Sequence, residues 1–323
     1  MNLFSNPARV PVGPVADLGL TAIDLFAGLG GFTEGAEQAG VTVRWAANHW
    51  PAAVETHRMN HPHADHECQD LQQADWRNVP AHDLLLASPA CQGHSPARGK
   101  ERAHHDATRS TAWAVVAAAE YHQPQACIIE NVRAFADWKL FPAWCSAMQA
   151  LGYAIAPHVF DAADVGVPQH RERLFLICTR SEHPLQIELE RRPHVAAASI
   201  IDFDDGNWNP IEKPGRADAT LRRVRRARAT YGERFVMPYY GGGSGLTGRS
   251  LARPIGTITT RDRWAVVDGD RMRMLTRHEN RRAMGFRDSY RIPDDHRLAV
   301  HMLGNAVCPP LVREVIKAVA ARI

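Results

Sequence analysis

The stretch AIDLFAGLGGFTEGAEQAG, residues 22–40, contains the change of pattern that decides the fold. It opens with the short apolar run AIDLF, which is typical of a buried strand. Three glycines, Gly28, Gly30 and Gly31, then predict a loop, and FTEGAEQAG predicts a helix that is closed by Gly40. Glycines at such a turn allow close backbone approach, and a helix N-terminus offers free N–H groups to a ligand.

The glycine loop also narrows the class of ligand. A nicotinamide dinucleotide fingerprint needs a glycine where this chain has Thr33, and the Gly-Lys-Ser/Thr of a P-loop is absent. A nucleoside without a pyrophosphate is then the better candidate, and an ordinary tight turn is the alternative. Asp70 in CQDLQ, where another strand is expected to end, could accept from an adenine amino group or could cap a helix.

The same alternation continues along the chain. Helices are expected at TAWAVVAAAEYH and LFPAWCSAMQALG, between the expected strands VTVRWAAN, HDLLLAS, ACIIEN and RLFLICT. Alternating strands and helices predict a doubly wound α/β sheet, whose ligands bind outside the carboxyl ends of the strands. Cys91 and Glu130 both come directly after expected strands, so we expect both in one crevice.

The pattern changes near Ser181. Residues 181–252 are rich in arginine, proline and glycine, which predicts a second, smaller domain. Its segment GRADATLRRVRRARATYGERF is expected either to contact phosphates or to form an amphipathic helix with a solvated basic face. The C-terminal run PPLVREVIKAVAARI predicts a helix that is opened by proline and returns to the first sheet.

Composition restricts location and partners. The net charge of +3 permits an anionic partner, and we expect a cytoplasmic chain because no apolar stretch approaches a membrane span. The six cysteines show no Cys-x-x-Cys pair and are expected to be free thiols. The stretch HPHADHEC, residues 61–68, fits no familiar zinc spacing, so a solvated loop is expected there and no metal.

Six motifs identify a family resemblance. DLFAGLGGF, SPACQGHS, IIENV, VPQHRERLFLI, LTRHENRRAMGF and LGNAVCPP occur in the order typical of cytosine-C5 DNA methyltransferases. The resemblance runs from about Ile23 to the C-terminus, apart from the arginine-rich region, which is the variable target-recognition domain of that family. It implies a Rossmann-like, S-adenosylmethionine-dependent methyltransferase sheet in a catalytic and cofactor-binding domain of residues 1–180. A target-recognition domain of residues 181–270 and a returning segment of residues 271–323 would follow.

The resemblance also implies the chemistry. Carbon 5 of cytosine is a poor nucleophile until a thiolate adds at carbon 6, and Cys91 is the implied nucleophile on a flipped-out base. Glu130 would hold or protonate the ring at N3, and Arg171 and Arg173 would supply fixed positive charge. For Arg171, a structural role in salt bridges around the following strand is as well supported as a role beside the base. The implied cofactor-binding residues are Phe26, Gly28, Leu29, Gly30, Gly31, His49, Trp50, Asp70, Leu71, Asn305 and Val307. The expected DNA-binding residues are Gln92, Ser95, Arg98, Arg253 and Thr260.

Three positions depart from the pattern of the family. Ala90 replaces a proline, His94 replaces phenylalanine or leucine, and His49 stands where a glutamate usually binds the ribose hydroxyls. Histidine can make such a hydrogen bond but lacks the paired acceptors of a carboxylate. The alternative to a cofactor-binding role for GNAVCPP is a helix start that is capped by Asn305.

Two other functions stay open at this point. One is a tRNA cytosine-C5 methyltransferase, although its Cys-Phe-Thr segment is absent, and the other is a protein that flips cytosine without methylating it. The expected partner is double-stranded DNA, with a restriction endonuclease that acts on the same site as a companion. The chain itself is expected to be a monomer at the nucleoid.

Overall fold

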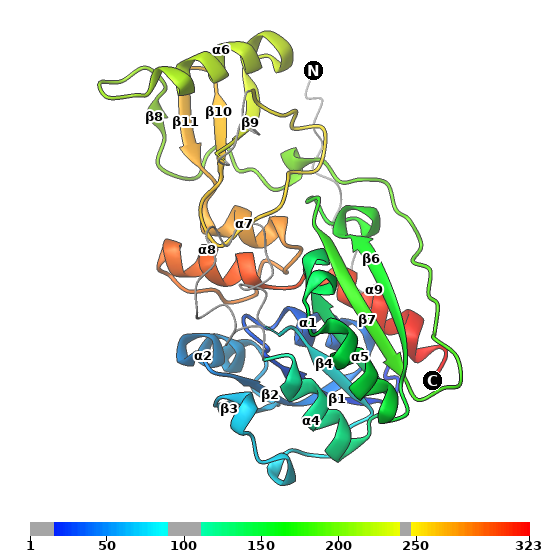
Figure 1. Ribbon diagram of the computed structural model, residues 1–323. Coiled ribbons are helices and arrows are strands. Elements are labelled where there is room, and N and C mark those ends of the chain that lie inside the picture. The colour runs from blue at the N-terminus through cyan, green and yellow to red at the C-terminus, as the bar shows by residue number, and fades with distance from the viewer. Residues whose placement is uncertain (1–15, 90–110, 240–246) are drawn as a thin grey trace. The chain divides into compact units, whose positions relative to one another are not determined.

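The computed structural model describes residues 16–89, 111–239 and 247–323 (Figure 1). The described residues divide into two compact units. The larger unit runs from residue 16 to Asp161 and includes Glu172–Arg191 and Ala306–Ile323; the smaller unit comprises Ala162–Arg171 and Arg192–Asn305. The compact units therefore divide at other residues than the expected domains 1–180, 181–270 and 271–323.

The larger unit is built on a seven-stranded sheet with the order β3-β2-β1-β4-β5-β7-β6. Neighbouring strands from β3 to β5 are parallel, whereas β7 is antiparallel to both β5 and β6. This confirms the predicted doubly wound α/β sheet. The strands are β1 (Thr21–Leu25), β2 (Thr42–Asn48), β3 (Asp65–Cys68), β4 (Leu84–Ala87), β5 (Ala126–Asn131), β6 (Ala154–Asp161) and β7 (Glu172–Thr179).

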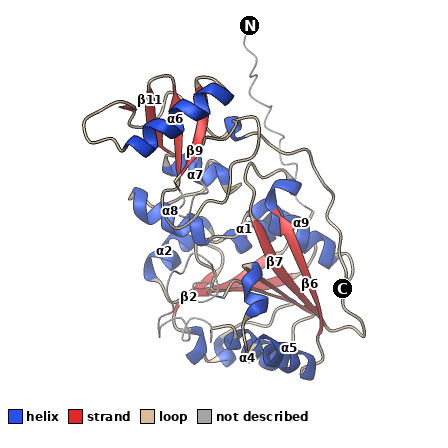
Figure 2. Cartoon of the chain, turned by 45° about the horizontal axis from the view of Figure 1, so that its top comes forward, coloured by secondary structure: helices blue, strands red, loops and turns tan. Residues whose placement is uncertain are grey.

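Helices cover both faces of this sheet because its strands are apolar on both sides. In β1, Ile23 and Leu25 join a buried cluster with side chains of α4 and α5, while Asp24 between them bonds to Thr33 of α1. Figure 2 shows α4 and α5 together on one side of the strands. The helices are α1 (Gly31–Ala39), α2 (Pro51–Asn60), α4 (Trp113–His122), α5 (Phe141–Ala150) and α9 (Pro309–Ala320), with short 3₁₀ turns at Leu71–Gln73, Trp76–Asn78 and Arg133–Asp137.

Helices α1 and α9 pack with their backbones unusually close. A Cβ atom on Gly31 would lie 2.2 Å from the carbonyl oxygen of Val307, and one on Gly35 would lie 2.5 Å from Cβ of Val312. Only glycine allows this approach. Residues 306–323 thus return to the larger unit, whereas residues 271–305 belong to the smaller one.

Strand β6 is absent from the sequence-based prediction. It lies at the edge of the sheet, carries Pro157 and alternates irregularly in burial, so it lacks the apolar run of a central strand. A 3₁₀ turn at Ala162–Val165 follows β6 in place of a crossover helix. Strand β7 then pairs antiparallel with β6. Antiparallel strands need no helical crossover, which explains why strict alternation fails here.

The smaller unit contains a four-stranded antiparallel sheet with the order β8-β11-β10-β9. The arginine-rich segment forms helix α6 (Asp218–Tyr231), which buries Thr220, Val224 and Ala227 and packs on β9. The strands are β8 (Asn209–Pro210), β9 (Arg234–Pro238), β10 (Trp264–Asp268) and β11 (Arg271–Met274), and the remaining helices are α7 (Arg277–Ala283), α8 (His296–Asn305) and a 3₁₀ turn at Ala197–Ser199.

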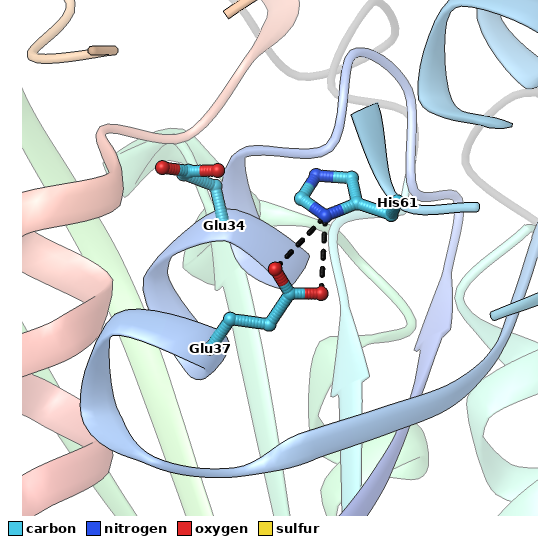
Figure 3. A group of neighbouring side chains, drawn as sticks. All are labelled: Glu34, Glu37 and His61. Carbon is cyan, nitrogen blue, oxygen red and sulfur yellow. Dashed lines mark hydrogen bonds and ion pairs between the residues drawn. The ribbon is translucent and has the colours of Figure 1, made fainter. Parts of the chain in front are cut away.

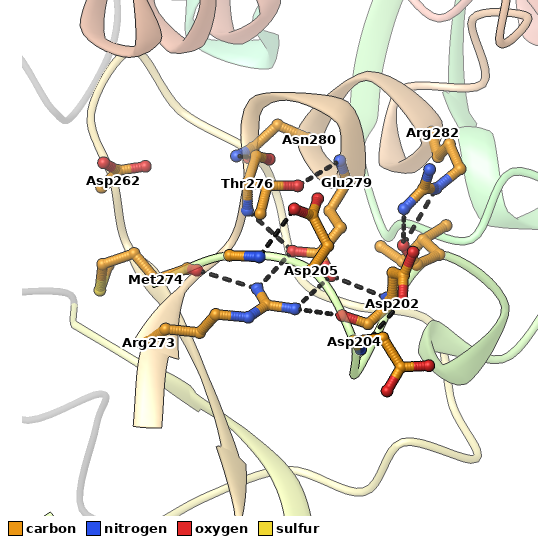
Figure 4. A network of polar contacts seen from close by, with 12 residues as sticks. Asp202, Asp204, Asp205, Asp262, Arg273, Met274, Thr276, Glu279, Asn280 and Arg282 are labelled. Carbon is orange, nitrogen blue, oxygen red and sulfur yellow. Dashed lines mark hydrogen bonds and ion pairs between the residues drawn. The ribbon is translucent and has the colours of Figure 1, made fainter. Parts of the chain in front are cut away.

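A buried ion pair joins three segments of the smaller unit (Figure 4). Arg273 donates to both carboxylate oxygens of Glu279 at 2.7 Å and to the carbonyl oxygen of Asp202 at 2.6 Å. Glu279 also accepts from the backbone N–H of Thr276, whose hydroxyl in turn accepts from the N–H of Glu279. This capping box fixes the start of α7, so one carboxylate serves both a helix terminus and a buried cation.

The expectation of a solvated loop at residues 61–68 was wrong. His61 is fully buried, and Asp65–Cys68 form β3, paired in parallel with β2. The five cysteines among the described residues are free thiols. Within the described ranges, no helix is both long enough and apolar enough to cross a membrane.

Candidate active site

The predicted site residues of the larger unit gather at the ends of its parallel strands. Phe26 follows β1, His49 follows β2, and Asp70 lies two residues beyond β3. Glu130 is the second-last residue of β5, and Pro89, two residues before the predicted nucleophile, lies two residues beyond β4. Because these strands are parallel, their carboxyl ends meet at one edge of the sheet. This is the edge at which doubly wound sheets bind ligands.

The glycine loop takes a conformation that its sequence allows. Phe26, Gly28 and Gly30 have φ angles of 60°, 54° and 96°, in the left-handed region that favours glycine. Gly30 is the N-cap residue of α1, and because it has no side chain, no side-chain cap bonds to the first N–H groups of this helix. The N–H of Ala27 donates to the carbonyl oxygen of Ala47 at 3.1 Å, which holds the loop against the end of β2. Phe26 is the one non-glycine in this loop with positive φ, a strained conformation that is often found at functional sites.

The loop residues divide between two tasks. Gly28 has positive φ, and among the described residues a Cβ atom built on it would meet only the carbonyl oxygen of Phe26, at 3.7 Å, so the space beside Gly28 is open to a ligand. Gly31, by contrast, lies against Val307, and its missing side chain is needed for that contact. Leu29 is buried. Gly31 and Val307 therefore have a packing role that the motif alone does not show.

Asp24 lies directly behind the loop and is fully buried. Its Oδ2 accepts from the hydroxyl of Thr33 at 2.8 Å and from the N–H of Thr33 at 3.2 Å. Burial raises its pKa to about 7, and the two hydrogen bonds from Thr33 oppose that rise. The Thr33 hydroxyl also contacts Nε2 of His57 at 3.0 Å. This carboxyl group is thus tied to the first turn of α1.

The residues predicted for the nucleoside follow β2 and β3. His49 is exposed, and Trp50 is half-buried at the start of α2, where its N–H donates to Oδ1 of Asn48 at 2.9 Å. Asp70 is exposed and caps a 3₁₀ turn by accepting from the N–H of Gln72 at 3.0 Å, while Leu71 is buried. Asp70 therefore fills its cap role, and a carboxylate can still accept further hydrogen bonds.

Glu130 is paired with Arg173 in the same unit. Nε of Arg173 lies 3.0 Å from Oε1 of Glu130, and both side chains are largely buried, 14% and 8% exposed. The antiparallel pairing of β5 and β7, with Glu130 opposite Phe175, brings the two together. A guanidinium at this distance orients the carboxylate and balances its charge.

Two polar residues at this edge were not predicted as site residues. Nδ2 of Asn131 donates to the carbonyl oxygen of Pro89 at 3.0 Å, and the hydroxyl of Ser88 donates to the carbonyl oxygen of Phe26 at 3.3 Å. They connect the segment after β4 to β5 and to the glycine loop. The signal was available, because Asn131 follows Glu130 in IIENV. Cys91, Gln92, Ser95 and Arg98 lie outside the described residues.

Arg171, although two residues from Arg173, belongs to the smaller unit. It is 2% exposed and donates to the carbonyl oxygens of Ile258 at 2.9 Å and Gly304 at 3.0 Å. A Cβ on Gly304 would collide with the backbone of Thr259 and Thr260, so this glycine is needed for the same packing. Arg171 thus connects the segment before β7 to two others of its unit.

The remaining predicted residues of the smaller unit are more accessible. Arg253 is exposed and Thr260 is half-buried. Asn305 is exposed and ends α8, so the alternative in which it caps the next helix is wrong; Cys308 precedes α9. Most of the loop from Tyr239 to Gly248 lies outside the described residues.

Known proteins resemble the chain over almost its whole length. The sequence model of C-5 cytosine-specific DNA methylases matches residues 20–321. Type II methyltransferase M.NlaX of Neisseria lactamica is 29% identical over 93% of this chain and 96% of its own. M.HhaI of Haemophilus parahaemolyticus, another Type II methyltransferase, is 28% identical over 90% of both chains. The solved structure of a DNMT2 variant of Spodoptera frugiperda superposes with a TM-score of 0.66 over 93% of this chain and 99% of its own, at 15% identity, which shows the shared fold.

Proposed function

Since the chain belongs to the family of C-5 cytosine-specific DNA methylases, we propose that it methylates duplex DNA through a covalent adduct of Cys91, with S-adenosylmethionine as the methyl donor. The observation that carries this proposal is the buried Glu130–Arg173 pair at the carboxyl edge of the sheet. It lies in the same unit and at the same edge as the glycine loop. A ring-activating acid and a nucleoside-binding loop are the two parts that this reaction needs in one crevice.

The residues at the edge fit S-adenosylmethionine. The positive φ of Gly28 and its open surroundings leave space beside the start of α1, and Phe26 offers a half-buried ring. Asp70 and His49 are exposed. In this proposal Asp70 accepts from the adenine amino group and His49 hydrogen bonds to the ribose hydroxyls. When bound, the cofactor supplies an electrophilic methyl group. Asn305 and Val307 are further proposed cofactor residues, although Val307 also packs on Gly31.

The chain's own side chains perform the activation of the base. In this proposal the Cys91 thiolate adds to carbon 6 of the flipped-out cytosine, which makes carbon 5 nucleophilic. Glu130, oriented by Arg173, hydrogen bonds at N3 and stabilises the charge that develops on the ring. Asn131 holds the carbonyl oxygen of Pro89, two residues before the nucleophile. Arg171, which donates to two backbone carbonyls, supports the fold of its unit rather than the base.

DNA contacts are proposed for residues of both units. Gln92, Ser95 and Arg98 flank the nucleophile in sequence, and Arg253 and Thr260 lie in the smaller unit. Arg253 is exposed, so its guanidinium is accessible to a phosphate. A restriction endonuclease that acts on the same target remains the proposed companion, and the chain is proposed to act as a monomer.

The decisive experiment supplies labelled S-adenosylmethionine with duplex DNA or with bulk tRNA. Transfer to DNA is expected, and bisulfite sequencing of the product would locate the methylated cytosines. Transfer to tRNA alone would favour an RNA methyltransferase, and transfer to neither would favour a protein that binds cytosine without methylating it.

The role of Cys91 has its own test. Duplex DNA with 5-fluorocytosine at the target should trap a denaturation-resistant complex that contains the transferred methyl group, because fluorine cannot leave as a cation. Cys91→Ser should form no adduct, since a serine hydroxyl is scarcely ionised at neutral pH. Undiminished methylation by Cys91→Ser would end the assignment.

A further inference from the structure

Four metal-ligating side chains meet where α1 passes the end of α2. Glu34 and Glu37 lie on α1, one turn apart, and His61 and His63 come directly after α2. Figure 3 shows both glutamates rising from the same helix, with His61 facing Glu37. None of these four side chains has a part in the proposed methylation. Any role of this cluster is therefore separate from the methylation reaction.

Three of the four side chains lie close enough to share one ion, and His63 reaches this group through Glu37. Nδ1 of His61 lies 3.0 Å and 3.1 Å from the two oxygens of Glu37, and Nε2 of His63 lies 2.8 Å from Oε1 of Glu37. One ligand atom each from Glu34, Glu37 and His61 lie within 4.8 Å of one another. Around a tetrahedral ion with metal–ligand bonds of about 2.1 Å, ligand atoms lie about 3.4 Å apart. The atoms of Glu37 and His61 would therefore move slightly apart, and the more distant atoms of the group would move closer.

Burial favours a metal over a loose surface pair. His61 and Glu34 are fully buried, and Glu37 is one-quarter exposed, so their interactions are screened little by water. Nε2 of Gln38 donates to Oε1 of Glu34 at 2.8 Å and orients that carboxylate. Such outer partners are what hold metal ligands in place. His63 is half exposed and Glu37 is one-quarter exposed, so an ion could enter from their side of the cluster.

Further imidazole rings surround His61. The ring centre of His57 lies 4.8 Å from that of His61, with the two ring planes tilted by 48°, and the ring of His66 lies 4.8 Å from that of His57. A neutral imidazole presents the lone pair that a metal needs.

We propose that Glu34, Glu37, His61 and His63 bind one divalent transition-metal ion of the Zn²⁺ class. Two imidazole nitrogens and two carboxylates form a mixed N/O donor set, which suits Zn²⁺ better than the oxygen-seeking Mg²⁺ or Ca²⁺. Four protein ligands would close the site, so its role is structural. The ion would tie α1, which starts at the glycine loop, to α2, which starts after His49.

Simple hydrogen bonding is the competing explanation. Each imidazole could donate an N–H to Glu37, and this hydrogen bond needs a proton on the nitrogen atom whose lone pair a metal would use. The two explanations therefore predict different results when a metal is added. If the cluster is a metal site, the metal binds tightly and releases protons; if it is only hydrogen bonded, the metal does not bind to the cluster. The proposal is independent of the methylation reaction.

The experiment uses the full chain without an affinity tag, stripped with a chelator and dialysed. Zn²⁺ is titrated by calorimetry, and Co²⁺ is titrated in its place to record the visible spectrum of its ligand field. We expect one equivalent of either ion, a rise in the midpoint of thermal unfolding, and no sulfur-to-cobalt charge-transfer band. Glu37→Gln keeps the shape of the side chain and should weaken Zn²⁺ binding at least about tenfold.

One control variant and one further ligand variant make the result specific. Glu55→Gln removes an exposed carboxylate of α2 that pairs with Arg58, and its Zn²⁺ affinity should equal that of the wild type. His63→Ala removes the half-exposed ligand and should weaken Zn²⁺ binding as Glu37→Gln does, without the cost of altering buried His61. Absence of binding to the wild type would overturn the proposal. Equal binding by wild type and Glu37→Gln, or a charge-transfer band that shows thiolate ligation at Cys68 or another cysteine, would also overturn it.

Discussion

The two units each contain a buried arginine–glutamate pair, and the two pairs are built differently. In the smaller unit, Arg273 and Glu279 are almost wholly buried and joined by two hydrogen bonds. They are also bonded to the backbone of Asp202, Met274 and Thr276. In the larger unit, Nε of Arg173 meets one oxygen of Glu130, and both side chains keep some exposure at the carboxyl edge of the sheet.

The difference shows how one residue pair can serve structure or chemistry. Removing one partner from a fully desolvated pair leaves a buried charge and costs stability. A carboxylate that keeps some exposure at the edge of a sheet can accept a hydrogen bond from a substrate beside its ion pair. The comparison therefore predicts that Glu279 is needed for folding and Glu130 for turnover.

The largest effect is expected for Glu130→Gln. Methyl transfer should fall by about 10²–10⁴-fold, because ring activation is lost while shape is kept. Binding of S-adenosylmethionine and the unfolding midpoint should change little. Single-turnover kinetics with calorimetric titration of the cofactor would separate the two. A variant that lost cofactor affinity at an unchanged rate would show that Glu130 serves the cofactor.

Glu279→Gln is expected to act on stability. The change leaves Arg273 buried without its counter-charge and weakens the capping box of α7, so the free energy of unfolding should fall by about 3–5 kcal/mol. Urea denaturation measures this, with Glu212→Gln, an exposed carboxylate of the same unit, as the control. If the loss were no larger than for that control, the two pairs would not differ as the comparison states.

Asp24 sharpens the comparison, because it is a buried carboxyl group with hydroxyl and N–H partners from Thr33. Its pKa is raised from 3.8 to about 7, so between these values the folded chain retains a proton that the unfolded chain has released. The resulting stabilisation is complete below about pH 4 and is lost as the pH rises through about 7. Asp24→Asn removes this group's contribution.

Urea unfolding at several pH values tests this prediction. The difference in unfolding free energy between wild type and Asp24→Asn should change across that window, with the variant gaining relative stability toward higher pH. Thr33→Val serves as a control that removes the hydroxyl partner but keeps the titrating carboxyl group. A difference that stays constant with pH would mean that the carboxyl group titrates alike in both states.

The smallest effect is expected on the surface of α6. Arg222 and Arg226 are exposed, whereas Arg223 donates to the carbonyl oxygen of Pro238 and lies over the ring of Tyr239. Arg222→Gln with Arg226→Gln should weaken binding to all duplexes alike and lower the salt dependence of binding by about two counterions. Arg223→Gln is the matched comparison, because its guanidinium has a packing role.

Filter-binding or anisotropy titrations against salt, with bisulfite mapping of the methylated sites, would measure both variants. If the double variant changed site preference while its salt dependence stayed the same, the exposed arginines would be reading bases rather than contacting phosphates.

Local patterns made most of the larger unit predictable. The apolar runs of β1, β4 and β5 and the glycines after β1 specify strands and a turn through sterics within a few residues. Edge strand β6 escaped prediction because Pro157 and its partial burial leave no such pattern. The arginine-rich segment forms helix α6 with Val224 and Ala227 facing inward, and phosphate contacts of its exposed arginines stay a prediction.

The sequence by itself determined the family, the order of the motifs and the alternation that makes a doubly wound sheet, because these depend on residue identity and near neighbours. Only the tertiary structure decided which side chains meet. Register across β5 and β7 brings Arg173 to Glu130, close packing on Val307 gives Gly31 its second role, and Arg171 bonds within the other unit. Burial of His61 beside Glu37 likewise depends on how α1 and α2 pack. Such contacts join residues far apart in the chain, so no spacing in the sequence encodes them.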